Sequence, residues 1–131
     1  MVTVDRELLP RLDRERSVWI CTLRPDGSPH VTPVWFVYSK ATWWVASAEQ
    51  NRKIRNLTQD PRVSLALEDG RSPAVAEGRA QLHRSNFPTE ITTAFADKYQ
   101  GWDITAPEPA AGARVLIEIP VTRWLLKGRA Q

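Results

Sequence analysis

The sequence predicts a mainly β protein with flanking helices, in which about six largely antiparallel strands close into a small barrel. Runs that alternate between apolar and polar residues are typical of half-buried strands, and Arg62–Glu68 (RVSLALE) is one example. Most of these runs are joined by short turns, which connect antiparallel neighbours. At 131 residues the chain is long enough for one core but not for two, so we expect residues 1–131 to form a single domain.

The N-terminal half is predicted to contain a short helix followed by strands. Leucines at helical spacing predict the helix over Val4–Leu12, with Asp5 as a candidate N-cap and Pro10 limiting its length. The strands are predicted over Ser17–Arg24, Val31–Tyr38 and Thr42–Ala46. Because Pro33 lacks an N–H, we expect the second of these strands to lie at a sheet edge or to carry a bulge.

The C-terminal half alternates helices and strands. A second helix is predicted to begin after Ser47 or Asn51, which are competing N-caps. Further strands are predicted over Arg62–Glu68, Ala74–His83 and Arg114–Leu126. Gly78 marks a bulge or a close backbone approach, while Pro88 and Gly101 begin and end a third helix. The apolar face of that helix comprises Ile91, Ala94, Phe95 and Tyr99.

The composition narrows the range of functions. The net charge of +3 fits a ligand that bears phosphate or carboxylate groups, and it also fits weak nucleic-acid binding. The single cysteine, Cys21, excludes an internal disulfide and a cysteine-rich metal site, and we expect it to pack in the core. Met1–Arg16 lacks the apolar stretch of a secretory segment, and no run has the length of a membrane span, so we expect a cytoplasmic location.

Few side chains suggest direct catalysis. His30 and His83 have no acidic or cysteine cluster near them in sequence, so we expect no metal site. The serines lack an elbow motif, so no nucleophile is nominated. Glu77 is a conceivable general acid, but a salt bridge to a neighbouring strand is the favoured interpretation.

The second predicted helix opens with three basic residues, Arg52, Lys53 and Arg55. A helix N-terminus carries partial positive charge, so cations there are mildly destabilising. A bound anion would resolve the conflict, because the helix end and the cations would attract the same guest. A solvated basic face on a surface helix is the alternative, and charge alone leaves both interpretations open.

The six tryptophans are a high number for a chain of this length. Trp43 and Trp44 are adjacent in a strand and must face opposite ways. One of them is therefore expected to leave the barrel core, toward a partner subunit or a planar ligand. We expect a homodimer whose interface buries the surplus indole surface.

Three segments resemble the split β-barrel flavin and deazaflavin proteins related to pyridoxamine 5′-phosphate oxidase. They are His30–Tyr38 (HVTPVWFVY), Ser47–Leu65 (SAEQNRKIRNLTQDPRVSL) and Ala74–Leu82 (AVAEGRAQL). The middle segment looks most like the actinobacterial branch that uses the deazaflavin coenzyme F420. The resemblance runs from about Val4 to Trp124, and it implies an FMN-binding split barrel that forms a homodimer with the cofactor in a groove between subunits.

The resemblance also implies where the cofactor binds. The phosphate would meet the strand-to-helix junction, and the ring would lie along the strand whose backbone contacts its polar edge. The implied cofactor-binding residues are Thr32, Pro33, Val34, Trp35, Ala46, Ser47, Asn51, Lys53 and Arg55. The arginine-rich substrate motif of the true oxidases has no counterpart near the C-terminus, so vitamin synthesis is not expected.

The expected function is that of an F420-dependent reductase, which passes a hydride from the reduced deazaflavin to a quinone, enone or tetrapyrrole. One alternative is an FMN-dependent enzyme on the same fold. Another is a non-catalytic barrel that carries a cofactor or binds nucleic acid. Nucleic-acid binding would need basic residues along a groove, whereas those of this chain are concentrated at one helix end, which suits a single phosphate better.

Overall fold

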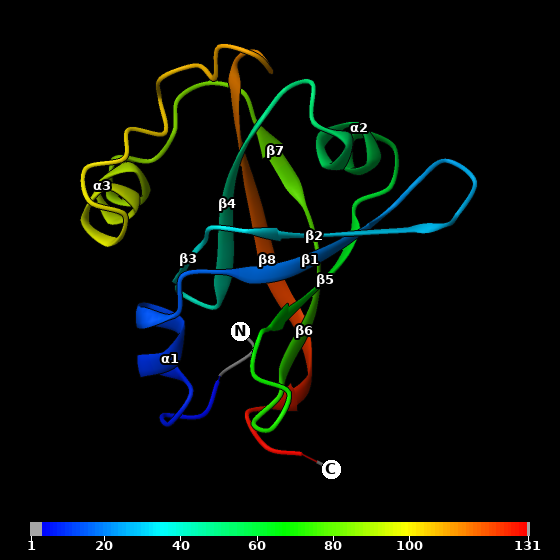
Figure 1. Cartoon of the computed structure of the whole chain (residues 1–131), viewed down its shortest axis with the longest axis vertical. Coiled ribbons are helices and arrows are strands. Elements are labelled where there is room, and N and C mark those ends of the chain that lie inside the picture. The colour runs from blue at the N-terminus through cyan, green and yellow to red at the C-terminus, as the bar shows by residue number, and fades with distance from the viewer. Residues whose placement is uncertain (1–3, 131) are drawn as a thin grey trace.

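The computed structural model describes residues 4–130, which form a curled antiparallel sheet and three helices (Figure 1). The expected mainly β split barrel is confirmed. The strands are β1 (Val18–Leu23), β2 (Pro29–Val34), β3 (Val37–Ser39), β4 (Thr42–Ala48), β5 (Arg62–Leu67), β6 (Ala74–Arg79), β7 (Gln81–His83) and β8 (Arg114–Lys127). The helices are α1 (Leu9–Arg14), α2 (Arg52–Gln59) and α3 (Thr89–Lys98).

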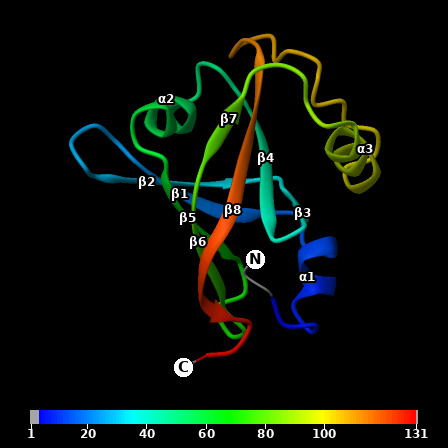
Figure 2. The same cartoon turned by 180° about the vertical axis from the view of Figure 1, so that it is seen from behind.

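The strands follow the order β2-β1-β5-β6-β8-β4-β3, with β7 also paired to β8. The long strand β8 joins the two halves of the sheet: its first half pairs with β4 and β7, and its second half pairs with β6. Figure 2 shows β7 and β4 on either side of the upper part of β8. In both views, α2 and α3 lie on opposite sides of the molecule, and β2 runs from the side of α2 to the side of α3.

Residues 4–130 contain eight strands in place of the expected six, because two predicted strands are each divided. Val31–Tyr38 becomes β2 and β3, which pair with different partners at opposite ends of the strand order. Ala74–His83 is divided at Ala80, whose N–H donates to the carbonyl of Pro61 (2.8 Å). A curled sheet obliges strands to change partners at its corners, and the apolar alternation continues across such a bend without marking it.

Gly78 lies at the corner of β6, as predicted. The register of β6 against β8 shifts between Glu77 and Gly78, which is a bulge. A Cβ at Gly78 would lie only 2.6 Å from the carbonyl oxygen of Pro120. Glu77 forms the expected cross-strand salt bridge, with its Oε1 2.9 Å from Nη2 of Arg123.

One helix start differs from the prediction, and a second prediction is decided between its two alternatives. The helix α1 begins at Leu9 and not at Val4, because Pro10 fits the first turn, where no N–H is needed. Asp5 is therefore not its N-cap. The helix α2 has Asn51 as its N-cap residue and not Ser47. The helix α3 follows the prediction, with Ile91, Phe95 and Tyr99 buried on one face.

Buried apolar side chains form two clusters, one on each face of the sheet around β4. Trp43 lies fully buried in the barrel core, and Trp44 lies with α3 in the second cluster. Trp44 therefore leaves the barrel core as expected, but it packs under a helix of its own chain and not against a partner or ligand. The placement of Cys21 in the core was wrong, since its side chain is half-exposed on β1. No helix within residues 4–130 is long and apolar enough to cross a membrane.

Candidate functional site

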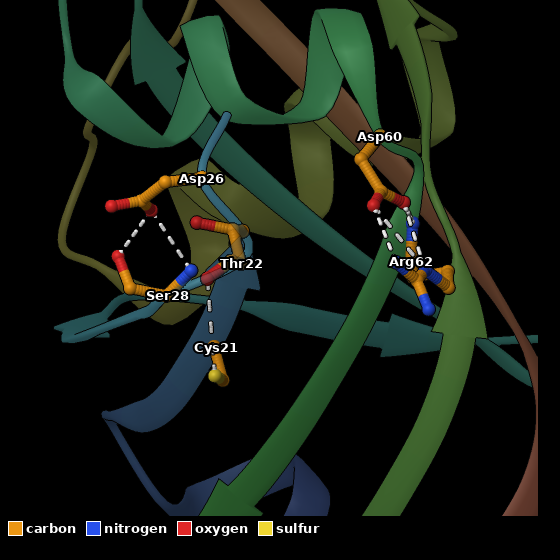
Figure 3. Close-up of polar contacts among 6 residues, drawn as sticks. All are labelled: Cys21, Thr22, Asp26, Ser28, Asp60 and Arg62. Atoms are coloured by element: carbon orange, nitrogen blue, oxygen red, sulfur yellow. Dashed lines mark hydrogen bonds and ion pairs between the residues drawn. The ribbon is translucent and has the colours of Figure 1, made fainter. Parts of the chain in front are cut away.

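The helix α2 packs against the barrel along its middle turns. Ile54 and Leu57 are buried in the barrel core, and the side-chain amide of Asn56 donates to Oγ1 of Thr22 on β1 (3.0 Å). At the other end of the helix, the carboxylate of Asp60 accepts three hydrogen bonds from the guanidinium of Arg62, two from Nε and one from Nη2, as Figure 3 shows. These contacts fix the direction in which the first turn of α2 points.

The first turn of α2 has no side-chain cap. The Nδ2 of Asn51 donates to Oγ of the buried Ser47 (2.8 Å) in place of an oxygen capping the helix. No acidic side chain stands in the first turn. Within the described residues, the N–H groups of Arg52 and Lys53 have no hydrogen-bond partner. Free N–H groups at a helix start are donors for an anion.

The three cations of α2 have different environments. Lys53 is half-buried, and burial lowers the pKa of its ammonium while Glu108 opposes that shift. Arg52 is exposed. Arg55 is exposed too, and its Nη2 donates to the carbonyl of Gln50 (3.3 Å). The negative charge of a bound anion would therefore stabilise the Lys53 ammonium against the effect of its burial.

His30 belongs to the same site, although the sequence analysis weighed it only as a metal ligand. Its Nδ1 is buried without a hydrogen-bond partner. Burial lowers the pKa of His30, and the positive charges of Arg24, Lys53 and Arg52 lower it further, so the ring is neutral at pH 7. The signal that could have identified it is its position in the β2 segment, two residues before Thr32.

The predicted ring-contact residues lie on β2 and in the link that follows it. β2 is the end strand of the sheet, so the expectation of an edge for Pro33 is confirmed. Thr32 and Val34 are half-buried, while Pro33 and Trp35 are exposed. A free strand edge offers backbone donors and acceptors to a ligand. On β4, Ala46 is half-buried and packs against the apolar cluster that contains Trp44 and the buried face of α3.

The structure thus brings Ser47, Asn51 and Lys53 together and places His30 beside them, while Thr32–Trp35 extends toward α3. Four surface pockets of the chain are lined by residues other than these. One of them has a volume of about 560 Å³, and Arg84, Phe87 and Arg114 are among the residues that line it. The predicted residues are partly buried and partly exposed, and a second subunit would have to cover the exposed ones to enclose a ligand. In the described part of the chain, no group of three or more His, Cys, Asp or Glu side chains is placed to hold a metal.

Comparison with known proteins gives a family match and several solved structures of the same fold. The family described as pyridoxamine 5′-phosphate oxidase matches residues 4–128. A solved structure described as an F420 reductase is 24% identical with a TM-score of 0.72, over 94% of this chain and 98% of that chain. Rv2991, a conserved hypothetical protein of Mycobacterium tuberculosis, is 23% identical with a TM-score of 0.72, over 95% of this chain and 84% of that chain.

A third solved structure is HutZ, the heme storage protein of Vibrio cholerae. It is 15% identical with a TM-score of 0.73, and the match covers 98% of both chains. At these identities each of the three likenesses shows a shared fold.

Proposed function

This chain belongs to the pyridoxamine 5′-phosphate oxidase family, and on that premise we propose that it is a reductase that uses the deazaflavin coenzyme F420 to reduce an unsaturated organic acceptor. The observation that carries the proposal is the uncapped, cationic start of α2. It combines free N–H groups, the half-buried Lys53 and no acidic side chain. The fold shared with an F420 reductase supports the choice of coenzyme.

The residues at this site fit the phosphate of such a coenzyme. The N–H groups of Arg52 and Lys53 would donate to phosphate oxygens, and the Lys53 ammonium would add a charge-assisted hydrogen bond. Asn51 would contribute its amide, and Arg55 would contribute long-range positive charge. The neutral ring of His30 would lie near the same cations, but the chain itself buries its Nδ1, so we assign no phosphate contact to that atom.

The ring of the coenzyme would lie along the free edge of β2, against the backbone of Thr32–Trp35 and close to Ala46. Because β2 runs from the side of α2 toward α3, a phosphate at Lys53 and a ring near Trp35 would lie along one strand (Figure 1). When bound, the reduced deazaflavin supplies a hydride. The protein positions the coenzyme and shields it from water, so we nominate no catalytic side chain.

We also propose that a second copy of the chain completes the groove. The facing pairs Trp19–Pro33 and Cys21–Val31 lie on the outer face of β1 and β2. Trp19 is 42% exposed and Val31 is 56% exposed, which leaves an apolar face for an isologous partner. The cytoplasmic location expected from the sequence is part of the same proposal.

Separate calorimetric titrations of the purified protein with coenzyme F420 and with FMN test the proposal. We expect F420 to bind more tightly. The second measurement mixes protein, reduced F420 and a panel of quinones and enones, and follows the return of oxidised coenzyme absorbance. We expect one hydride to be transferred from one reduced coenzyme for each acceptor molecule reduced, with the accompanying proton taken from water.

The outcomes separate the alternatives. Tight FMN binding and FMN-dependent turnover, with no effect of F420, would assign the protein to the FMN-dependent class. If neither coenzyme binds, the enzyme proposal fails, and binding to single-stranded nucleic acid becomes the next measurement.

A further inference from the structure

Trp35 occupies the link between β2 and β3, and the chain holds this link rigidly. The Tyr99 hydroxyl accepts a hydrogen bond from the N–H of Phe36 (2.8 Å). Its proton lies within reach of the carbonyl oxygens of Phe36 (2.8 Å) and Arg16 (2.9 Å). Burial raises the pKa of Tyr99 to about 12, so the hydroxyl stays protonated and the link stays tied to α3.

The indole of Trp35 is itself fixed by aromatic contacts. Its ring is stacked on that of Tyr99, with centroids 4.5 Å apart and planes within 5°. The ring of Trp102 meets it edge-on, at a centroid distance of 5.3 Å. Even so, 43% of Trp35 is exposed. An exposed indole that is already packed against two other rings offers a flat surface on which a ligand ring can stack at a low cost in side-chain ordering.

A cation stands beside this surface. The guanidinium carbon of Arg16 lies 5.4 Å from the centre of the Trp35 ring and 4.9 Å from that of Tyr99. Within the described part of the chain, its side chain donates one hydrogen bond, from Nη1 to the carbonyl oxygen of Lys98, and that bond is long (3.4 Å). Within residues 4–130 no acidic side chain forms an ion pair with Arg16.

The other charges around this cation do not neutralise it. Lys98 lies on the same side of α3, where its Nζ donates to the carbonyl of Leu12 (3.1 Å). Asp13 and Glu15 are near enough to affect Lys98, but Glu15 is already ion-paired with Arg11. Arg16 is thus the cation that the structure places against the exposed indole.

We propose that Trp35 and Arg16 recognise the acceptor, and that the acceptor is a flat conjugated molecule bearing a carboxylate. This inference rests on the proposed reductase function, because Trp35 ends the segment proposed to contact the coenzyme ring. The indole stacks on the conjugated ring system, and the guanidinium pairs with the carboxylate. In this proposal the side chain of Trp35 contacts the acceptor, whereas its backbone contacts the coenzyme ring.

Binding of two matched probes in the absence of coenzyme tests this inference. Anthraquinone-2-carboxylate and anthraquinone-2-carboxamide share one ring system and differ in charge. Calorimetry is carried out on the wild type and on Trp35→Leu, Trp35→Phe and Arg16→Gln, with Leu125→Ala and Arg71→Gln as controls with exposed side chains. Circular dichroism establishes that each variant is folded, and F420 affinity is measured separately on each.

We expect the wild type to bind the carboxylate more tightly than the carboxamide. Trp35→Leu should weaken both probes by roughly tenfold or more, and Trp35→Phe should weaken them less, because a phenyl ring still stacks. Arg16→Gln should abolish the difference between the probes and leave the carboxamide affinity unchanged. The control variants should bind both probes as the wild type does, and Trp35→Leu should lose more affinity for the probes than for F420.

Unchanged probe binding in folded Trp35→Leu would overturn the inference. So would a loss of F420 affinity without a loss of probe affinity, which would assign Trp35 to the coenzyme. Loss of a dimer with unchanged probe affinity would assign it to a subunit interface, again against the inference. Probe selectivity that depends on Arg16 in a protein that binds no F420 would instead sink the proposed function and leave the recognition surface standing.

Discussion

Lys53 is the residue on which the proposed phosphate site depends most. It stands in the uncapped first turn of α2, it is half-buried, and Glu108 is the acidic group that acts on its pKa. A cation already stripped of part of its water gains more from a phosphate than a fully solvated one does. His30 adds a neutral ring with an unpartnered nitrogen.

Replacing Lys53 by alanine should weaken F420 binding by roughly ten- to a hundredfold, because a charge-assisted hydrogen bond is worth about 1.5–3 kcal/mol. Calorimetric titration of the variant measures the effect. Lys127→Ala is the control, since it removes the same charge at the far end of β8 (Figure 1). Wild-type affinity in Lys53→Ala, or an equal loss in Lys127→Ala, would remove the main support for the phosphate site.

At the scale of elements, the hydroxyl of Tyr99 holds the link between β2 and β3. In Tyr99→Phe the buried N–H and carbonyl of Phe36 would lose their hydrogen-bond partner. We expect the free energy of unfolding to fall by about 1–3 kcal/mol. Urea denaturation measures this change, and the slope with denaturant should stay the same.

Tyr38→Phe is a matched control, because the Tyr38 hydroxyl is buried with no hydrogen-bond partner. Its removal should change stability by less than about 0.5 kcal/mol or raise it. Equal losses of unfolding free energy in Tyr99→Phe and Tyr38→Phe would show that the Tyr99 hydroxyl does not hold the link between β2 and β3.

The corner of β6 allows a similar paired test. In Gly78→Ala the new methyl group would meet the Pro120 carbonyl oxygen at 2.6 Å and Cγ2 of Ile119 at 2.7 Å. We expect a loss of about 1–3 kcal/mol of stability from overpacking. Gly70→Ala has no atom within 4 Å of the new Cβ and should be neutral or slightly stabilising. Thermal unfolding of both variants decides, and a stable Gly78→Ala would mean that the bulge can shift at little cost.

At the scale of the whole molecule, the prediction concerns the outer face of β1 and β2. We expect light scattering to report a dimer at micromolar concentration. Val31→Glu and Trp19→Glu should shift it to a monomer, because a charge opposite its own copy is costly in an isologous interface. Leu9→Glu, at an equally exposed position on α1, should leave the dimer intact. A wild-type monomer in the presence of F420 would contradict the prediction.

Several features could be predicted from the sequence because they depend on neighbours along the chain. Period-two alternation predicts β5 and β8 to within about two residues of their bounds, and Pro88 with Gly101 brackets α3. Pro33 at an edge and Gly78 at a bulge follow from a missing N–H and a missing Cβ. The basic start of α2 is likewise a local signal.

Other features depend on contacts between segments far apart in sequence, and only the tertiary structure decided them. Tyr99 holds the link at Phe36 from 63 residues away, so the division of β2 from β3 leaves no local trace. Trp44 is covered by α3, which adjacent tryptophans alone could not indicate. His30 comes near the candidate phosphate site only because the fold brings its ring within range of the charges on Arg52 and Lys53. Local propensity determines the elements and their faces, whereas burial and the partner of each polar group are decided when the sheet curls.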